Sequence, residues 1–341
     1  MSTRARVAVL GGGLAGITAA LDCADAGAEV TLLEVRRRLG GAAYSVAREG
    51  LVMDNGQHVF LRGCDAYRGL LRRLGSEHLV RVQERLEIPV LAPGRPVHVL
   101  RRDTARPPLH LARALASYPH LRPLERARAA WAALALSRVS PAELRRDRTT
   151  LGEWLARHGQ GERAVAALWD LIALPTLNLP AAEASLALGE FVFRRGLLTS
   201  ASEGDIGFHE GTLQDIIGSP AERALRAAGV DVRLGFRAHA IDARGGELQI
   251  EGRVGSEVES VEGCAAVVVA LPHLRAAPLL APLLGAPAAR LRGLGASPIV
   301  NLHVLYDREV CELPFAAGVG TPVQYLFDRT RAGGAPSGMQ Y

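Results

Sequence analysis

The sequence contains no lysine, so all 40 of its Lys-or-Arg positions are arginines. Enzymes that form a Schiff base, attack through a lysine or bind phosphate with a P-loop lysine all need an amine, and these classes are excluded. Cysteine is scarce as well. The four cysteines, Cys23, Cys64, Cys264 and Cys311, include no C-x-x-C pair. We therefore expect neither a disulfide framework nor a thiolate metal site, and a reducing, cytoplasmic setting fits best.

Long apolar runs and metal-ligand motifs are missing too. No stretch reaches about 20 apolar residues without glycine or charge, so we expect no membrane-spanning helix. The ten histidines show no H-E-x-x-H or similar spacing, which predicts that the protein holds no metal. A net charge of +5 without a nucleic-acid motif argues against a nucleic-acid partner.

What is present is enough apolar sequence for a large core. The chain has 341 residues, of which 48% are hydrophobic, and this length suits two domains of about 150 residues each. The pattern is helical between residues 109 and 195. The apolar runs Val267 to Leu271 and Pro298 to Tyr306 predict two buried strands.

The strongest local signal lies near the N-terminus. A strand from Arg6 to Leu10 leads into G-G-G-L-A-G and then a helix, and a second strand ends at Glu34. In this G-x-G-x-x-G pattern Gly11 makes the tight turn, Gly13 lets a pyrophosphate approach, and Gly16 packs helix on strand. Leu14 and Ala15 open the helix, whose N–H groups attract phosphate. Glu34 is placed to accept ribose hydroxyls, so we predict dinucleotide binding.

The segment after Glu34 carries a family resemblance. Its sequence, E-V-R-R-R-L-G-G, resembles the flavin-dependent amine oxidase and phytoene desaturase superfamily. The resemblance implies that Arg36, Arg38, Gly40 and Gly41 wrap the adenosine and diphosphate of FAD. The family usually has arginine after the glycine pair, whereas this chain has Ala42.

A second matching element narrows the resemblance. M-D-N-G-Q-H-V-F at residues 53–60 is similar to the squalene-associated FAD-dependent desaturases, or hydroxysqualene dehydroxylases. This implies flavin contacts at Gly56 and Gln57 and catalytic candidates at Asp54 and His58. An alternative for His58 is a hydrogen-bonded residue without a chemical role. Further candidates for a proton donor are Asp205 and His209, and the family's backbone clamp on adenine falls by position near Ala240.

The resemblance also implies the architecture. We expect an α/β fold in which a Rossmann-type FAD-binding domain, a parallel sheet with helices, is interleaved with an α+β substrate domain containing a helical insertion. The FAD-binding domain would comprise residues 1–75 and 220–285, and the substrate domain residues 76–219 and 286–341. The family's C-terminal glycine–acid segment is not recognisable in residues 307–341. The chain therefore reads as truncated there, and we expect weakened FAD binding, an inactive fragment and uncovered apolar faces that promote aggregation.

The implied function is an FAD-dependent oxidoreductase of squalene and hopanoid biosynthesis. Reduced flavin would deliver hydride to hydroxysqualene as its hydroxyl departs, with an external electron donor and a triterpenoid substrate as partners. Two alternatives stay open, a carotenoid-type isoprenoid desaturase and a non-catalytic isoprenoid-binding protein. Apolar residues of the helical region could line a substrate tunnel or pack the core equally well: Trp169, Leu174, Leu177, Phe191 and Phe193.

An arginine-rich stretch bears on where in the cell the protein is located. Residues 101–148 hold 11 arginines against four acidic residues, with apolar positions between them. Such helices lie on anionic membrane surfaces or form solvated faces over a helical core. A cytoplasmic protein in peripheral contact with the inner face of the cytoplasmic membrane is therefore one expectation.

Overall fold

The computed structural model describes residues 4–56 and 59–341, and the chain divides into two compact units. Described residues of the first unit lie within Met1–Gly56, Ala66–Val80 and His209–Ala296. Those of the second lie within Gln57–Asp65, Arg81–Phe208 and Ser297–Tyr341. Residues 209–219 and 286–296 therefore group with the first unit, although the sequence assigned them to the substrate domain. The functional names of the two parts stay predictions.

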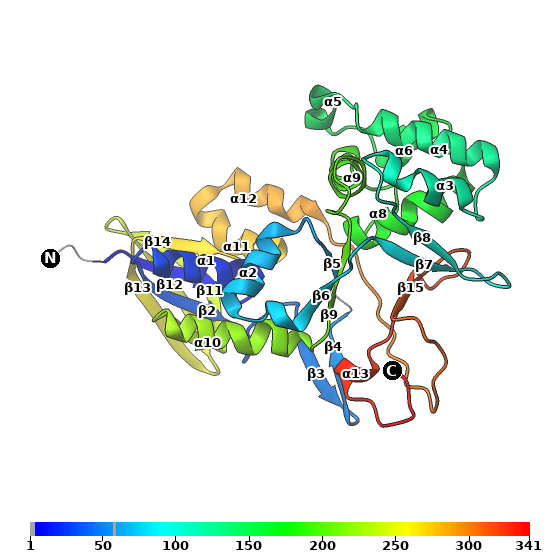
Figure 1. Ribbon diagram of the computed structural model, residues 1–341. Helices are drawn as coiled ribbons and strands as arrows, with labels where there is room; N and C mark the ends of the chain where they lie inside the picture. Colours follow the sequence, from blue (N-terminus) through cyan, green and yellow to red (C-terminus); the bar gives the residue numbers. More distant parts are fainter. Residues whose placement is uncertain (1–3, 57–58) are drawn as a thin grey trace. The chain divides into compact units, whose positions relative to one another are not determined.

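The first unit is built on a parallel sheet. Its strand order is β10-β2-β1-β14, and every neighbouring pair is parallel. Figure 1 labels β2 and β14 of this sheet. The strands are β1 (Arg6–Leu10), β2 (Glu29–Glu34), β10 (Asp231–Leu234) and β14 (Ala266–Val269). Helix α1 (Leu14–Asp25) connects β1 to β2, as parallel neighbours require. The predicted Rossmann-type α/β architecture is confirmed.

Further elements cover this sheet. An antiparallel sheet of β11, β12 and β13 follows β10, and β3 pairs with β4 in a hairpin. Apolar side chains of α1, α2 and α10 pack with those of β1 and β2 in one core cluster. The remaining elements of this unit are β3 (Ser45–Arg48), β4 (Leu51–Asp54), α2 (Asp65–Leu74), α10 (Ser219–Ala227), β11 (Phe236–Arg244), β12 (Glu247–Val254), β13 (Glu257–Cys264), α11 (His273–Leu284) and α12 (Ala286–Leu291).

The second unit combines small sheets with helices, which fits the predicted α+β domain with a helical insertion. One sheet has the order β16-β15-β7-β8, and another has the order β5-β9-β6. The strands are β5 (Val59–Leu61), β6 (Val80–Val82), β7 (Glu87–Leu91), β8 (His98–Arg101), β9 (Ile206–His209), β15 (Phe315–Gly318) and β16 (Tyr325–Phe327). The helices are α3 (Ala112–Ser117), α4 (Pro123–Leu136), α5 (Pro141–Arg146), α6 (Leu151–Arg157), α7 (Glu162–Ala164), α8 (Asp170–Leu177), α9 (Leu186–Phe193) and α13 (Thr330–Gly333).

Within the described ranges, no helix is both long enough and apolar enough to cross a membrane.

One predicted strand is wrong. Residues 298–305 form no strand. The next residue, Tyr306, forms an isolated β-bridge with Gln340. Val300 is 92% exposed and Leu302 is 85% exposed. A β-rich apolar sequence forms a strand only when a neighbouring strand accepts its backbone hydrogen bonds. No such neighbour lies beside it among the residues that the structure describes.

The rings of two histidines in the second unit lie against a tyrosine. The rings of His98 and His120 lie 5.7 Å and 5.1 Å from the ring of Tyr118, measured between centroids. Within the described chain, the Nε2 atoms of both histidines are buried without a hydrogen-bond partner. Burial lowers the pKa of His98, with Arg126 adding to the effect, and burial lowers the pKa of His120, with Arg95 and His98 adding to it.

The lowered pKa values of His98 and His120 predict that the protein loses stability in acid. In the unfolded chain both imidazoles regain a pKa near 6.5 and bind protons that the folded state does not bind. The free energy of unfolding should therefore fall between about pH 7.5 and pH 5.5. Urea unfolding at both pH values measures this difference, which should shrink in His98→Gln and His120→Gln. It should persist in His78→Gln, whose side chain is exposed. An equal pH effect in all three variants would contradict the assignment.

Candidate dinucleotide-binding site

In the turn after β1, the backbone packs directly against the backbone of neighbouring segments. Gly11 has φ +105°, and a Cβ there would lie 2.5 Å from the carbonyl oxygen of Ala270. A Cβ on Gly16 would overlap the carbonyl oxygen of Gly11. Glycine at both positions is therefore required by space, and it lets α1 start close against β1 and the end of β14. The predicted packing role of these glycines has a direct structural reason.

Gly13 differs from the other two glycines because it faces open space. It is the residue before α1, and a Cβ on it would meet only the Cα of Gly41 at 3.8 Å. Leu14 and Ala15 follow as the first residues of the helix. The N–H groups of a first helical turn have no partner within the helix, so they are available to an anionic ligand.

Glu34 has a role in the protein itself. This buried carboxylate accepts a hydrogen bond from the N–H of Gly12 at 2.6 Å through one oxygen and from the N–H of Arg36 at 2.7 Å through the other. It thereby ties the glycine-rich turn to the turn after β2. Each carboxylate oxygen has two lone-pair sites, so these bonds leave room for ribose hydroxyls.

The paired glycines pack directly on the glycine-rich turn. Gly40 donates to the carbonyl oxygen of Gly12 at 2.8 Å. Gly40 and Gly41 have φ +99° and +60°, and a Cβ on Gly41 would lie 2.9 Å from the Cα of Gly13. These contacts put the two glycine segments side by side, as the resemblance implies.

Arg38 provides the test of whether a phosphate fits here. One guanidinium nitrogen donates to the carbonyl oxygen of Gly41 at 3.0 Å, and the guanidinium carbon lies 3.5 Å from the centroid of the Tyr44 ring. The other terminal nitrogen, Nη2, is buried, and within the described chain it has no hydrogen-bond partner. Burial lowers the pKa of Arg38, and the neighbouring charge of Arg36 adds to this effect. Arg38 thus has a buried donor without an acceptor and contacts Gly41, which lies against Gly13, and this arrangement fits a diphosphate.

Asp54 lies at the end of the β3–β4 hairpin and is buried. Its Oδ1 accepts from the hydroxyl of Ser45 at 2.6 Å and from the N–H of Leu213 at 3.0 Å. Asp54 therefore joins the hairpin to the turn before α10. This contact positions the hairpin, and a catalytic role of Asp54 stays a prediction. Gly56 follows with φ +80°. The predicted residues Gln57 and His58 lie outside the described residues.

The remaining predicted contact, Ala240, lies on β11 beside a bulge. The pairing of β11 with β12 shifts between Ala238 and Ala240. Just before β11, the N–H of Gly235 donates to the carbonyl oxygen of Arg36 at 3.2 Å. The start of β11 thus lies next to the turn that follows Glu34.

Two further candidates are engaged in structural contacts. Asp205 is fully buried in the second unit between Arg62 at 3.1 Å and Arg102 at 2.7 Å. The hydrogen bond to Asp205 raises the pKa of Arg102. Asp205 therefore joins the segments that carry Arg62 and Arg102. His209, in the first unit, shares a 2.7 Å hydrogen bond with the hydroxyl of Tyr67.

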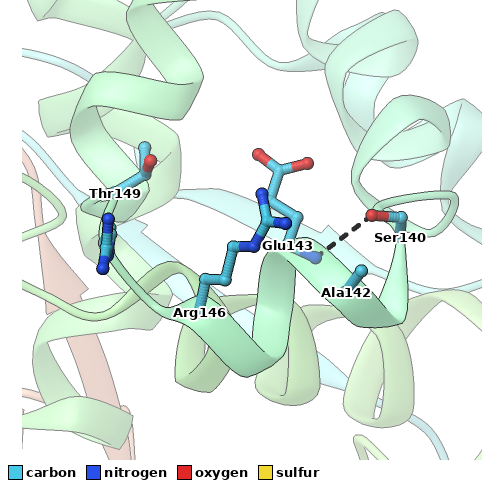
Figure 2. Close-up of a pocket in the computed structure, with 6 residues that line it drawn as sticks. Ser140, Ala142, Glu143, Arg146 and Thr149 are labelled. Atoms are coloured by element: carbon cyan, nitrogen blue, oxygen red, sulfur yellow. Dashed lines mark hydrogen bonds between the residues drawn. The ribbon is translucent and has the colours of Figure 1, made fainter.

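Of the proposed tunnel residues, two belong to the core. Trp169 and Phe193 are buried, with ring centroids 4.9 Å apart, so core packing accounts for both. Leu174, Leu177 and Phe191 keep some exposure. A separate surface pocket of about 720 Å³ lies at α5 and contains none of the predicted site residues. In Figure 2 its labelled residues include Arg146, Glu143 and Ser140, whose hydroxyl accepts from the N–H of Glu143.

Sequence reasoning missed two contributors to the site. Gly12 is the spacer of the G-x-G-x-x-G motif, yet its N–H holds Glu34. A Cβ on Gly12 would lie 2.7 Å from the Leu39 side chain, and three consecutive glycines are the available signal. Tyr44, which covers the guanidinium of Arg38, has no signal in the motif.

This fold and this turn define an α/β dinucleotide-binding protein. The model of the family described as flavin containing amine oxidoreductase matches residues 14–336. The chain belongs to this family, and the predicted cofactor, FAD, is confirmed as the cofactor of its family.

The chain is similar to curated relatives, and its fold is similar to that of solved structures. Hydroxysqualene dehydroxylase of Rhodopseudomonas palustris is 28% identical over 339 residues, covering 94% of this chain and 73% of that protein. Zeta-carotene desaturase of Solanum lycopersicum is 33% identical over 181 residues, covering 49% of this chain and 30% of that protein. The structure of wild-type putrescine oxidase bound to putrescine has a TM-score of 0.71 at 18% identity, covering 99% of this chain and 74% of that one. An oxidoreductase from Methanosarcina mazei has a TM-score of 0.70 at 16% identity, covering 98% and 77%.

Alanine at two of the glycines should separate folding from binding. Gly16→Ala places a methyl group into the Gly11 carbonyl and should destabilise the protein by about 3 kcal/mol. Gly13→Ala meets only an ordinary contact, so its melting temperature should stay near that of the parent while FAD affinity falls. Thermal melting and FAD titration measure the two effects, and equal melting temperatures for both variants would contradict the geometry.

Arg38 has a matched control in its neighbour. Arg38→Met keeps the apolar stem but removes the buried donor, so FAD should bind at least about tenfold more weakly. Arg37→Met removes the same charge from an exposed side chain and should change the affinity much less. Calorimetric titration with FAD measures both, and equal losses would show that only net charge matters.

Proposed function

We propose that this protein is a hydroxysqualene dehydroxylase of squalene and hopanoid biosynthesis, which replaces an allylic hydroxyl with hydrogen. The observation that carries the proposal is the extent of the similarity to the Rhodopseudomonas palustris enzyme. That similarity covers 94% of the chain and therefore includes most of both compact units.

The similarity to desaturases is narrower. The match to the tomato zeta-carotene desaturase covers 49% of the chain, which is too little to include most of both units. Substrate choice depends on the residues outside the dinucleotide turn, because the turn itself is shared by enzymes with many substrates. Similarity across both units thus supports the dehydroxylase more strongly than a higher identity over half the chain supports the desaturase.

When bound and reduced, FAD supplies a hydride and is oxidised by two electrons as the carbon–oxygen bond of the substrate breaks. The protein's own residues hold the cofactor for this step. The first turn of α1 and the buried donor of Arg38 would bind the diphosphate, and Glu34 would orient the ribose. Gly56, Gln57 and Ala240 are proposed to complete the contacts with FAD.

The departing hydroxide needs a proton to leave as water. Asp54 and His58 are the proposed sources. Because Oδ1 of Asp54 already accepts two hydrogen bonds, a substitution there would also disturb the turn at Leu213. The second unit would hold the apolar triterpenoid and exclude water from it.

The proposal includes an external electron donor, which returns two electrons to FAD after each turnover. It also includes a cytoplasmic location in contact with the inner face of the cytoplasmic membrane, where a C30 lipid can be collected.

A carotene-type desaturase is the second candidate, favoured by the 33% identity to the tomato enzyme. The two reactions run in opposite redox directions. A desaturase takes hydride from an isoprenoid and leaves reduced FAD, whereas a dehydroxylase consumes reduced FAD.

Anaerobic stopped-flow absorbance in the visible flavin band distinguishes them. The FAD-loaded, prereduced protein is mixed with hydroxysqualene, and the organic product is identified by mass. We expect flavin reoxidation that depends on substrate, with squalene formed in equal amount. The control is the same mixture with squalene in place of hydroxysqualene, which should leave the flavin reduced.

Two outcomes would contradict the proposal. Bleaching of oxidised FAD by an unsaturated carotene precursor, without reoxidation by hydroxysqualene, would assign a desaturase. Binding of isoprenoid without any change in flavin redox state would assign a non-catalytic isoprenoid-binding protein.

A further inference from the structure

Helix α4 presents large apolar side chains to solvent on one face. Leu124 is 62% exposed and Trp131 is 63% exposed. They are seven residues apart, two helical turns, so they lie above one another. Arg128 lies on the same side of the helix, and Arg138 follows two residues after the helix ends; both are exposed. We call this set, Leu124, Arg128, Trp131 and Arg138, the α4 face.

The α4 face is not needed for the core. A different side of the helix carries Ala129, Ala132 and Leu136, which are buried and pack in the two core clusters of the second unit. The helix therefore already has the buried stripe that stabilises it. The exposed Trp131 and Leu124 contribute nothing to this packing and are available to a partner outside the chain.

The charge beside this face is positive and unpaired. Within the part of the chain that the structure describes, no ion pair involves Arg128, Arg138 or the exposed arginines of α5 and the residues after it, Arg145, Arg146 and Arg148. Arg146 and Arg148 line the pocket of Figure 2, which begins at Ser140, two residues beyond Arg138.

Two of the nearby acidic residues are engaged by other groups. Glu125 is bound by Arg163 and by the backbone of Arg122, and these contacts lower its pKa. The carboxylate of Asp147 accepts from the hydroxyl of Ser185. Residues 101–148 carry 11 arginines against four carboxylates, one of them the exposed Glu143 of α5, so the segment keeps a positive charge.

We propose that the α4 face is the surface by which this protein docks on an anionic lipid bilayer. An indole ring and a leucine side chain enter the boundary between headgroups and acyl chains, and guanidinium groups bind lipid phosphates. A second copy of the chain is a poorer occupant, because the arginines of two such faces would repel. A soluble polyanion would satisfy the arginines but leave Leu124 and Trp131 in water.

This inference deepens the proposed function, since an enzyme acting on a C30 lipid has to reach a membrane. Its test needs neither hydroxysqualene nor turnover. Failure of membrane docking and failure of the dehydroxylase assignment can therefore be told apart.

Tryptophan fluorescence gives a direct readout. The chain has three tryptophans, of which Trp154 and Trp169 are buried. Vesicles of phosphatidylcholine with phosphatidylglycerol should shift the emission to shorter wavelength and protect it from iodide, whereas phosphatidylcholine alone should not. Trp131→Phe should abolish the spectral change while leaving part of the vesicle binding measured by flotation.

Charge variants test the arginines. Arg128→Gln combined with Arg138→Gln should weaken binding to the anionic vesicles about 25-fold, which is about fivefold for each arginine. Added salt should weaken the binding of the parent protein as well. The matched control is Arg223→Gln combined with Arg253→Gln, which removes two exposed charges from the first unit. Its vesicle affinity should stay close to that of the parent.

Several results would overturn the proposal. One is failure of the parent protein to bind the anionic vesicles. Another is an equal loss of affinity in both charge variants. A third is loss of binding only in Leu284→Ala combined with Leu294→Ala, which truncates exposed leucines of the first unit. A dimer in solution that Trp131→Phe dissociates would assign the face to a second copy.

Discussion

The carbonyl oxygen of Gly11 occupies the place where residue 16 would carry its Cβ. This one contact sets how closely α1 approaches β1, and the approach in turn aims the first turn of α1 past the ends of the parallel strands. Gly41 repeats the constraint from the other side, because only its lack of a side chain lets it lie against Gly13. The predicted phosphate-binding geometry thus depends on Gly16 and Gly41 having no Cβ atom.

Glu34 and Arg38 make opposite contributions around this contact. Glu34 is already satisfied by two backbone N–H groups and holds the two turns together. Arg38 is held by a carbonyl oxygen and an aromatic ring, but one of its buried nitrogens lacks an acceptor within the described chain. The protein thereby carries the desolvation cost of a cation before its ligand arrives, and a bound phosphate removes that cost.

The sequence predicted those features that depend on local spacing. The glycine pattern, Glu34 at a strand end and the helical stretch from 109 to 195 are all set by neighbours along the chain. Contacts between distant segments were not predictable in this way. Asp205 meets Arg62 and Arg102 only because three loops converge, so its candidacy as an acid could not be judged from spacing. The segment from Pro298 to Tyr306 has the composition of a strand, but a strand also needs a partner, and composition does not specify one.

The pairing of Val7 with Ala266 has a consequence for how the chain is made. β1 leaves the ribosome long before β14, its neighbour in the sheet, has been translated. Ala270, whose backbone packs against Gly11, directly follows β14. Until then one edge of β1 lacks its partner strand, and the dinucleotide site lacks the backbone that packs behind Gly11. Chaperones that cover such an edge would have to hold the nascent N-terminus through synthesis of the whole helical stretch from 109 to 195 and of the strands that follow it.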